Sequence, residues 1–261
     1  MSTRPLSKVT AAPVFALSLV LLLALWVVAA WAKGDPSVLP QPVEVWRIAV
    51  DEFLHGPMLH HITATLRRVV LAFAAAMVVG VAIGAALGLS PTADRWFGPW
   101  LTVFLNIPAL VVIVLCYLWI GLNETAAVTS VAVAKATMVA VTMREGVRSV
   151  DPGLAELARS YRFSTVNRLR HLWLPQLWPF LASAMRNGLA IIWKLVLVVE
   201  FLGRSDGVGF QIHLYFQLFE TGHVLAYALS FVAVMLALEY GLFRPLESRV
   251  GEWRRRGAAF A

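Results

Sequence analysis

Cysteine and charged residues are scarce in this 261-residue sequence. The single cysteine, Cys116, lies within an apolar stretch, so the chain has no internal disulfide and no cysteine-based metal cluster. Charged residues make up 14% of the chain and hydrophobic residues 59%, whereas an average soluble domain has about 25% and 45–50%. This composition excludes a typical soluble globular protein.

Two kinds of binding motif are also missing. His60 and His61 are adjacent and point to different sides of a helix, and no H-E-x-x-H spacing occurs among the six histidines. The sequence contains no G-x-x-x-x-G-K-[S/T] loop of the kind that binds ATP phosphates. We therefore expect neither a metal nor a cofactor in this chain.

Long apolar runs are what the sequence has in abundance. Each is close to the ~20 residues that a helix needs to cross the bilayer core. The runs predict an all-α membrane protein with about six transmembrane helices, at Val14–Ala32, Val69–Leu89, Trp100–Ile120, Ala126–Met143, Trp178–Val199 and Leu225–Leu242. The first run ends in Ala30-Trp31-Ala32, which resembles a signal-peptidase site, but its 19 residues exceed a typical signal-peptide core. We therefore predict a retained helix.

The basic residues predict the orientation of these spans. With a cytoplasmic N-terminus, fourteen of the 22 lysines and arginines lie inside: Arg4, Lys8, Arg95, Arg144, Arg148, Arg159, Arg162, Arg168, Arg170, Arg244, Arg249, Arg254, Arg255 and Arg256. Five lie outside: Lys33, Arg47, Arg67, Arg68 and Arg204. This asymmetry follows the positive-inside rule, so both termini are predicted to be cytoplasmic. The net charge of +7 is then a consequence of topology and does not indicate nucleic-acid binding.

The spans divide the chain into five predicted segments. They are a cytoplasmic N-terminus at 1–13, a first transmembrane helix at 14–32, a periplasmic segment at 33–62, a five-helix core at 63–243 that includes a cytoplasmic loop at 144–177, and a basic cytoplasmic tail at 244–261.

The loop at 144–177 has the sequence signals of two short helices. Asp151 and Pro152 form an N-cap followed by a proline at the first helical position. Ser164 is placed to cap a second helix that runs to about Leu172, and Pro175 is expected to break the chain after it. Ordered helices in a polar loop predict a docking surface.

This loop resembles a known family. Glu156-Leu-Ala-Arg-Ser-Tyr-Arg162, nine further residues and Leu172-Trp-Leu-Pro175 match the spacing E-A-A-x3-G-x9-I-x-L-P. That pattern marks the EAA loop in the membrane permeases of binding-protein-dependent ABC importers. The resemblance implies a type I ABC importer permease fold, and it extends over most of the chain after about residue 60.

The resemblance also implies partners and contact residues. In the family the loop forms two coupling helices that dock on the ATP-hydrolysing subunits, which use ATP and Mg²⁺. The corresponding residues here are Glu156, Leu157, Ala158, Ser160, Tyr161, Arg162, Phe163, Leu174 and Pro175. The implied assembly has two ATP-binding subunits, a second permease copy and a periplasmic or lipid-anchored substrate-binding protein, in the lipid of a bacterial inner membrane.

Arg162 stands where the family pattern has glycine. A positive φ at this position costs an arginine about 1–2 kcal/mol, so the chain either accepts that strain or forms a different turn. The arginine either presents a cation to the ATPase or is solvated near lipid headgroups.

Other stretches resemble the nitrate, sulfonate and taurine subgroup, among them Gly80-Val-Ala-Ile-Gly84, Gly146-Val-Arg-Ser-Val-Asp-Pro152 and Val199-Glu-Phe201. They imply a small, anionic solute. Members of this subgroup often carry an R-P-x-P-P segment where this chain reads Leu105-Asn-Ile-Pro-Ala109. The missing arginine weakens the transfer of an anionic substrate to this chain.

Charges within the spans are costly unless water or a partner satisfies them, which makes Lys135, Lys194 and Glu200 candidates for function. Lys194 is a candidate contact for an anion, or else it extends to the membrane surface. Glu200 is expected to serve the outer gate or an interhelical hydrogen bond. The predicted translocation pathway and gate comprise Asn106, Pro108, Trp119, Lys194 and Glu200.

Small residues recur every four positions in the second span, at Ala72, Ala76, Gly80, Gly84 and Gly88. This stripe predicts close helix packing, which is either static or a sliding contact. Beyond the fifth span, His213, Gln217 and Glu220 are predicted to share one helical face at the periplasmic mouth, where the binding protein docks.

Two alternatives remain open. An intramembrane enzyme needs convergent titratable groups on facing spans, whereas these spans offer isolated charges and no recognised catalytic constellation. A membrane scaffold or export component is the second alternative, which a lack of stimulation by a binding protein would favour. The sequence favours a permease subunit that is not itself an enzyme.

Overall fold

The computed structural model describes residues 11–239 and 241, and every regular element among them is helical. The α-helices are α1 (Ala11–Lys33), α2 (Pro42–Leu54), α3 (Met58–Leu89), α4 (Pro91–Asn106), α5 (Ala109–Ile120), α6 (Glu124–Arg148), α7 (Pro152–Ser160), α8 (Thr165–Arg168), α9 (Leu174–Gly203), α10 (Val208–Gln217) and α11 (Thr221–Leu238). A π-helix, Leu169–Trp173, joins α8 to α9. The predicted all-α class is confirmed.

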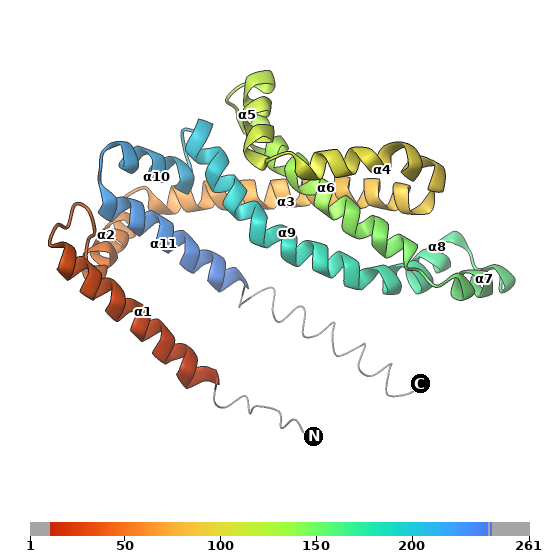
Figure 1. Ribbon diagram of the computed structural model, residues 1–261, viewed down its shortest axis with the longest axis horizontal. Helices are drawn as coiled ribbons and strands as arrows, with labels where there is room; N and C mark the ends of the chain where they lie inside the picture. The colour runs from red at the N-terminus through yellow and green to blue at the C-terminus, as the bar shows by residue number, and fades with distance from the viewer. Residues whose placement is uncertain (1–10, 240, 242–261) are drawn as a thin grey trace.

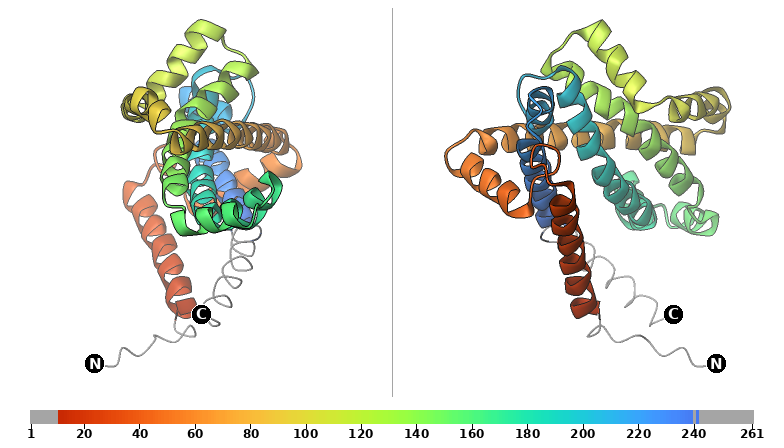
Figure 2. Two further views of the ribbon diagram at one scale, coloured as in Figure 1. Left: turned by 90° about the vertical axis from the view of Figure 1, so that its right-hand side faces the viewer. Right: turned by 60° about the vertical axis from the view of Figure 1, so that its left-hand side comes forward.

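The long helices α3, α6 and α9 form the centre of the molecule (Figure 1). Helices α7 and α8 lie at one end of the long axis, near the connection from α3 to α4, and α2 and α10 lie at the other end. We call these the α7 end and the α10 end. Helix α1 projects away from the bundle (Figure 2) and is tied to the chain before α2 by a hydrogen bond from Trp26 Nε1 to the Pro40 carbonyl, 3.1 Å.

The small-residue stripe of α3 packs on α6. A Cβ atom on Gly84 would lie 2.3 Å from the carbonyl oxygen of Ala140, and one on Gly80 would lie 2.6 Å from Cβ of Val139. At Gly88 the nearest atom would be Cβ of Val147, also 2.6 Å away. Because these three glycines have no side chains, α3 and α6 can lie close together along this part of the stripe.

Four helices in the described part of the chain are long and apolar enough to cross a membrane: α1, α3, α6 and α11. The bent pair α4 and α5 makes a fifth if it is counted as one span. The predicted span Trp178–Val199 lies within α9, whose 30 residues are long enough to cross but include Arg186, Lys194 and Glu200. Of the last predicted span, Leu225–Leu242, the structure describes the part within α11, and Leu242 lies outside the described residues.

The prediction of one continuous helix at Trp100–Ile120 is wrong. Helices α4 and α5 meet at a bend of 98°. Ile107, at the C-cap of α4, has the extended torsions φ −74° and ψ 123°, because a residue that precedes proline is pushed out of the helical region. Pro108 then stands at the start of α5 and has no N–H to donate to the preceding turn.

The expected chain break at Pro175 is also wrong. Pro175 lies in the first turn of α9, and the helix-like path from Thr165 to Gly203 continues through it. The π-helix directly before α9 widens the turn where the proline ring and its missing N–H interrupt the regular hydrogen-bond ladder.

Candidate functional site

The α7 end carries two short helices joined by a tight turn, which we call the α7–α8 hairpin (residues 151–168). The Asp151 side chain accepts a hydrogen bond from the Gly153 N–H at 2.7 Å, and Pro152 is the first residue of α7. Ser164 caps α8 by accepting from the Asn167 N–H at 3.3 Å. Local capping chemistry therefore orders this connection, as the sequence indicated.

Arg162 adopts φ +50° at the turn between α7 and α8. The N–H of Phe163 donates to the carbonyl of Ala158 at 2.9 Å, five residues back, which is the hydrogen bond of a Schellman motif. The chain thus accepts the left-handed conformation that the family fills with glycine. The backbone turn is retained at a cost of about 1–2 kcal/mol.

The hairpin exposes large apolar side chains. Tyr161 is 72% exposed, Phe163 40%, Val166 70% and Leu169, just after α8, 61%. Glu156, Ser160 and Arg162 are exposed beside them, as are Leu174 and Pro175 at the start of α9. Ala158 is buried, so it supports the hairpin from within.

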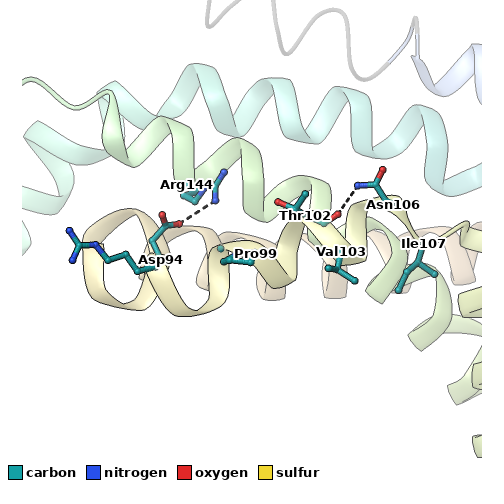
Figure 3. Close-up of a pocket in the computed structure, with 9 residues that line it drawn as sticks. Asp94, Pro99, Thr102, Val103, Asn106, Ile107 and Arg144 are labelled. Atoms are coloured by element: carbon teal, nitrogen blue, oxygen red, sulfur yellow. Dashed lines mark hydrogen bonds and ion pairs between the residues drawn. The ribbon is translucent and has the colours of Figure 1, made fainter.

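A second candidate site is an open groove of about 820 Å³ along α4 (Figure 3). Asp94, Gly98, Thr102 and Asn106 recur every four residues on the helix face that lines it, and Arg144 of α6 closes one end. Nη1 of Arg144 lies 3.2 Å from Oδ1 of Asp94, and Asn106 donates to the Thr102 carbonyl at 2.7 Å. The lining is mixed, because Pro99, Val103 and Ile107 stand beside these polar side chains. Helix α4 also exposes Trp96, Phe97 and Trp100.

The structure does not bring the five predicted pathway residues together in this chain. Asn106 lines the α4 groove, and Pro108 follows it at the bend into α5. Trp119 is 77% exposed near the end of α5. Lys194 is exposed on α9, with Nζ 5.5 Å from the centre of the Trp193 ring.

Glu200 lies fully buried in an ionic network at the α10 end. Its carboxylate accepts from Nη1 of Arg68 at 2.7 Å, and it also accepts from the hydroxyl of Thr65 at 2.9 Å. The same guanidinium, itself 1% exposed, binds Glu124 at 2.9 Å and Asp206 at 2.5 Å. This network, which we call the Arg68 network, joins α3, α6, α9 and the loop before α10.

Three side chains hold the start of α10. The N–H of Gly207 donates to Nδ1 of His61 at 3.0 Å, that of Val208 to Thr65 Oγ1 at 2.9 Å, and that of Gly209 to Glu200 Oε2 at 2.9 Å. These are N–H groups that a helix start cannot satisfy within itself. Helices α3 and α9 therefore fix the position of α10.

Asp206 is half-exposed at the edge of this network. Burial acts to raise the pKa of its carboxyl, but the hydrogen bond from Arg68 and the positive charges of Arg68 and Arg204 outweigh burial and lower the pKa. The carboxylate thus stays charged at neutral pH.

Sequence reasoning missed most of the Arg68 network. It counted Arg68 as a basic residue outside the membrane and gave no role to Thr65 or Asp206. One signal was available, since His61, Thr65 and Arg68 are spaced at i, i+4 and i+7 and so share a helix face. Their partners lie up to 150 residues away and follow no local pattern.

The predicted shared face of His213, Gln217 and Glu220 is partly wrong. His213 and Gln217 do meet on α10, with Nε2 of each side chain 2.8 Å apart. Helix α10 ends at Gln217, and Phe219 reverses the chain with φ +60°. Glu220 therefore leaves that face and pairs with His223 at 2.8 Å.

Lys135 is 3% exposed in α6. Its ammonium donates to the sulfur of Met138 at 3.1 Å, and its Cε would lie 3.8 Å from a Cβ on Gly188 of α9. Lys135 therefore packs inside this chain, between α6 and α9.

Two solved transporters share this arrangement of helices. A chain of the MetNI methionine ABC transporter, in an inward-facing structure, matches with a TM-score of 0.62 at 18% identity and covers 76% of this chain and 96% of its own length. A chain of an amino acid ABC transporter with histidines gives 0.60 at 23% identity, with coverage of 74% and 93%. The fold is therefore that of a type I ABC importer permease, as predicted.

The sequence comparison places the chain in a particular family. The family model of the binding-protein-dependent transport system inner membrane component matches residues 76–250. The chain belongs to this family. It is therefore a membrane permease of the ABC transporter class.

Its similar relatives include two permeases for sulfur-containing solutes. The taurine transport system permease protein TauC of Escherichia coli (strain K12) is 30% identical over 239 residues, which are 90% of this chain and 86% of the relative. The putative aliphatic sulfonates transport permease protein SsuC of Bacillus subtilis (strain 168) is 29% identical over 234 residues, 89% of this chain and 84% of the relative.

Proposed function

We propose that this chain is the permease subunit of an ATP-driven importer in a bacterial inner membrane, with both termini in the cytoplasm. It provides the pathway for a small anionic solute such as a sulfonate, taurine or nitrate, which a soluble or lipid-anchored binding protein delivers. Similarity to the taurine and sulfonate permeases supports this substrate class. Two copies of the chain pair with two ATPase subunits, which bind the ATP and Mg²⁺.

The exposed apolar surface of the α7–α8 hairpin is the observation that carries this proposal. Tyr161, Phe163 and Val166 project from an ordered, capped segment that also presents Glu156 and Arg162. An apolar patch with a charged rim is typical of a protein interface. The hairpin is therefore the EAA-type coupling loop, and the ATPase subunit is its partner.

The α4 groove is the proposed inner part of the pathway. Asp94 and Arg144 bring charged side chains to this groove, and charged side chains at membrane depth face protein or water. We assign Asp94, Thr102, Asn106 and Arg144 to a surface that the second permease copy completes. Lys194 and Trp119, exposed on other helices, join the pathway from the remaining sides of the dimer.

A charge reversal in the hairpin tests the proposal. Glu156→Lys is expected to lower ATP-driven uptake about tenfold or more, because a like charge at a docking surface weakens association. The readouts are uptake by cells that express the complete transporter and co-purification of the ATPase subunits. Glu44→Lys, at an exposed position on α2, is the matched control and is expected to leave both unchanged. Normal uptake by Glu156→Lys would contradict the docking role.

A further inference from the structure

Helix α2 has three faces of different composition. The first is buried against the bundle: Val45 is 4% exposed, and Ile48 lies against Gly222 of α11. On the same face Glu52 accepts hydrogen bonds from the hydroxyls of Tyr227 at 2.7 Å and Tyr215 at 3.3 Å. This face fixes α2 to α10 and α11.

The second face is apolar and exposed. It consists of Val43 (58% exposed), Trp46 (70%), Val50 (37%), Phe53 (52%) and Leu54 (65%). At 3.6 residues per turn these side chains fall within an arc of about 100°. No other helix in the described part of the chain covers this arc.

The third face is polar and exposed, and it carries Glu44, Arg47 and Asp51. Asp51 pairs with His55 at 2.9 Å on the same side. The three faces follow one another around the helix, so the apolar face lies between the bundle contact and the polar side. A helix that runs along the line where protein, lipid and water meet needs this order of faces.

The chain connections hold α2 at that line. Helix α1 ends at Lys33 and α3 begins at Met58, and both are long and apolar enough to cross a membrane. The link from α2 to α3 has three residues, 55–57, which reach about 10 Å at most. Helix α2 therefore stays next to the start of α3.

We propose that α2 lies in the membrane surface at the α10 end, with Val43, Trp46, Val50, Phe53 and Leu54 inserted among the lipid acyl chains and headgroups. Amphipathic helices of this kind rest at the boundary between headgroups and acyl chains. Tryptophan prefers that depth, since its ring is apolar and its N–H is polar. The bound partner is thus lipid, and the interaction anchors the connection between α1 and α3.

Spin labels test this placement directly. Cys116→Ser removes the native cysteine, and single cysteines are then introduced by Trp46→Cys and Phe53→Cys on the apolar face, Arg47→Cys and Asp51→Cys on the polar face, and Val45→Cys on the buried face. The full-length labelled protein is reconstituted in vesicles of phosphatidylethanolamine and phosphatidylglycerol. Accessibility of each nitroxide to oxygen, which concentrates in lipid, is compared with accessibility to a water-soluble nickel chelate.

The proposal predicts an oxygen-to-nickel accessibility ratio several-fold higher at positions 46 and 53 than at 47 and 51. Position 45 reports whether the helix keeps its contact with α11, because its label is immobile when that contact is intact. Nickel access at 46 and 53 equal to that at 47 and 51 would place the face in water and overturn the proposal. Labels at 46 and 53 that neither reagent reaches would also overturn it, because the face would then be covered by a second copy or another protein.

Discussion

Arg162 shows how one residue can depart from a family pattern without changing the fold. Its φ of +50° keeps the Schellman turn in which the Phe163 N–H bonds to the Ala158 carbonyl. Strained residues persist where the surrounding structure holds them in place, and they cluster at functional sites. In the proposed assembly Arg162 directs a cation at the ATPase subunit.

Arg162→Gly separates the backbone cost from the charge. The change relieves about 1–2 kcal/mol of strain and adds about 0.5–1 kcal/mol of chain entropy, so the turn becomes slightly more stable. Amide hydrogen exchange in α7 is expected to slow by about two- to fivefold, while ATP-driven uptake falls because the cation is lost. Phe219→Gly is the matched control, since Phe219 also has a positive φ, 60°, at the α10 end. Unchanged uptake in Arg162→Gly would show that the charge of Arg162 has no role in uptake.

Predictions for single residues were correct where the backbone conformation depends on neighbouring residues in the sequence. The helix caps at Asp151 and Ser164 follow from neighbouring residues in the sequence. So does the positive φ at Arg162, which was one of the two conformations expected there. The Arg68 network depends instead on four segments that meet only in the folded chain. Glu200 is predicted to serve either the outer gate or an interhelical hydrogen bond. It makes an interhelical bond, and the partner, Arg68 of α3, is 132 residues away and follows from no local pattern.

At the scale of elements, glycine determines where helices approach each other and where they turn. Gly207 has φ +108°, and a Cβ there would lie 2.3 Å from Cδ of Glu200. The start of α10 thus fits against a buried carboxylate only without a side chain. No local sequence pattern shows that this glycine faces Glu200.

Gly207→Ala is expected to displace Glu200 from Arg68 and to loosen α10. Unpairing a buried charge costs about 3–5 kcal/mol, in addition to the cost of the positive φ. The thermal unfolding midpoint of the purified protein in detergent measures this loss. Gly34→Ala is the control, because Gly34 also has a positive φ, 68°, but nothing lies within 4 Å of its Cβ position. Equal shifts for the two variants would show that backbone strain alone matters and that the Glu200 contact does not.

The break between α4 and α5 marks the limit of reading spans from hydropathy. The apolar run Trp100–Ile120 has the length of a single span, yet Pro108 and the extended Ile107 divide it into two helices. Periodicity reports which residues are apolar, and proline decides whether the backbone stays helical. Asn106, which lines the α4 groove, lies directly before this bend.

At the scale of the whole molecule, α9 connects the two ends that the proposed function requires. It starts at Leu174, beside the α7–α8 hairpin, and reaches Glu200 in the Arg68 network. A 30-residue helix is about 45 Å long, so α9 is one continuous element between the hairpin and the α10 end. We therefore predict that uptake depends on the Arg68 network.

Neutralising the two buried charges tests this connection. Arg68→Gln leaves Glu200 buried without its partner and is expected to lower both thermal stability and ATP-driven uptake. The double variant Arg68→Gln/Glu200→Gln is expected to recover most of the stability, because no fully buried charge is left unpaired: Glu124 and Asp206 are partly exposed and also lie near Arg204. It is not expected to recover the uptake, because the Arg68–Glu200 ion pair is gone. Arg67→Gln, whose side chain is 63% exposed, is the control and is expected to change neither. Uptake that recovers together with stability in the double variant would show that the network serves folding alone.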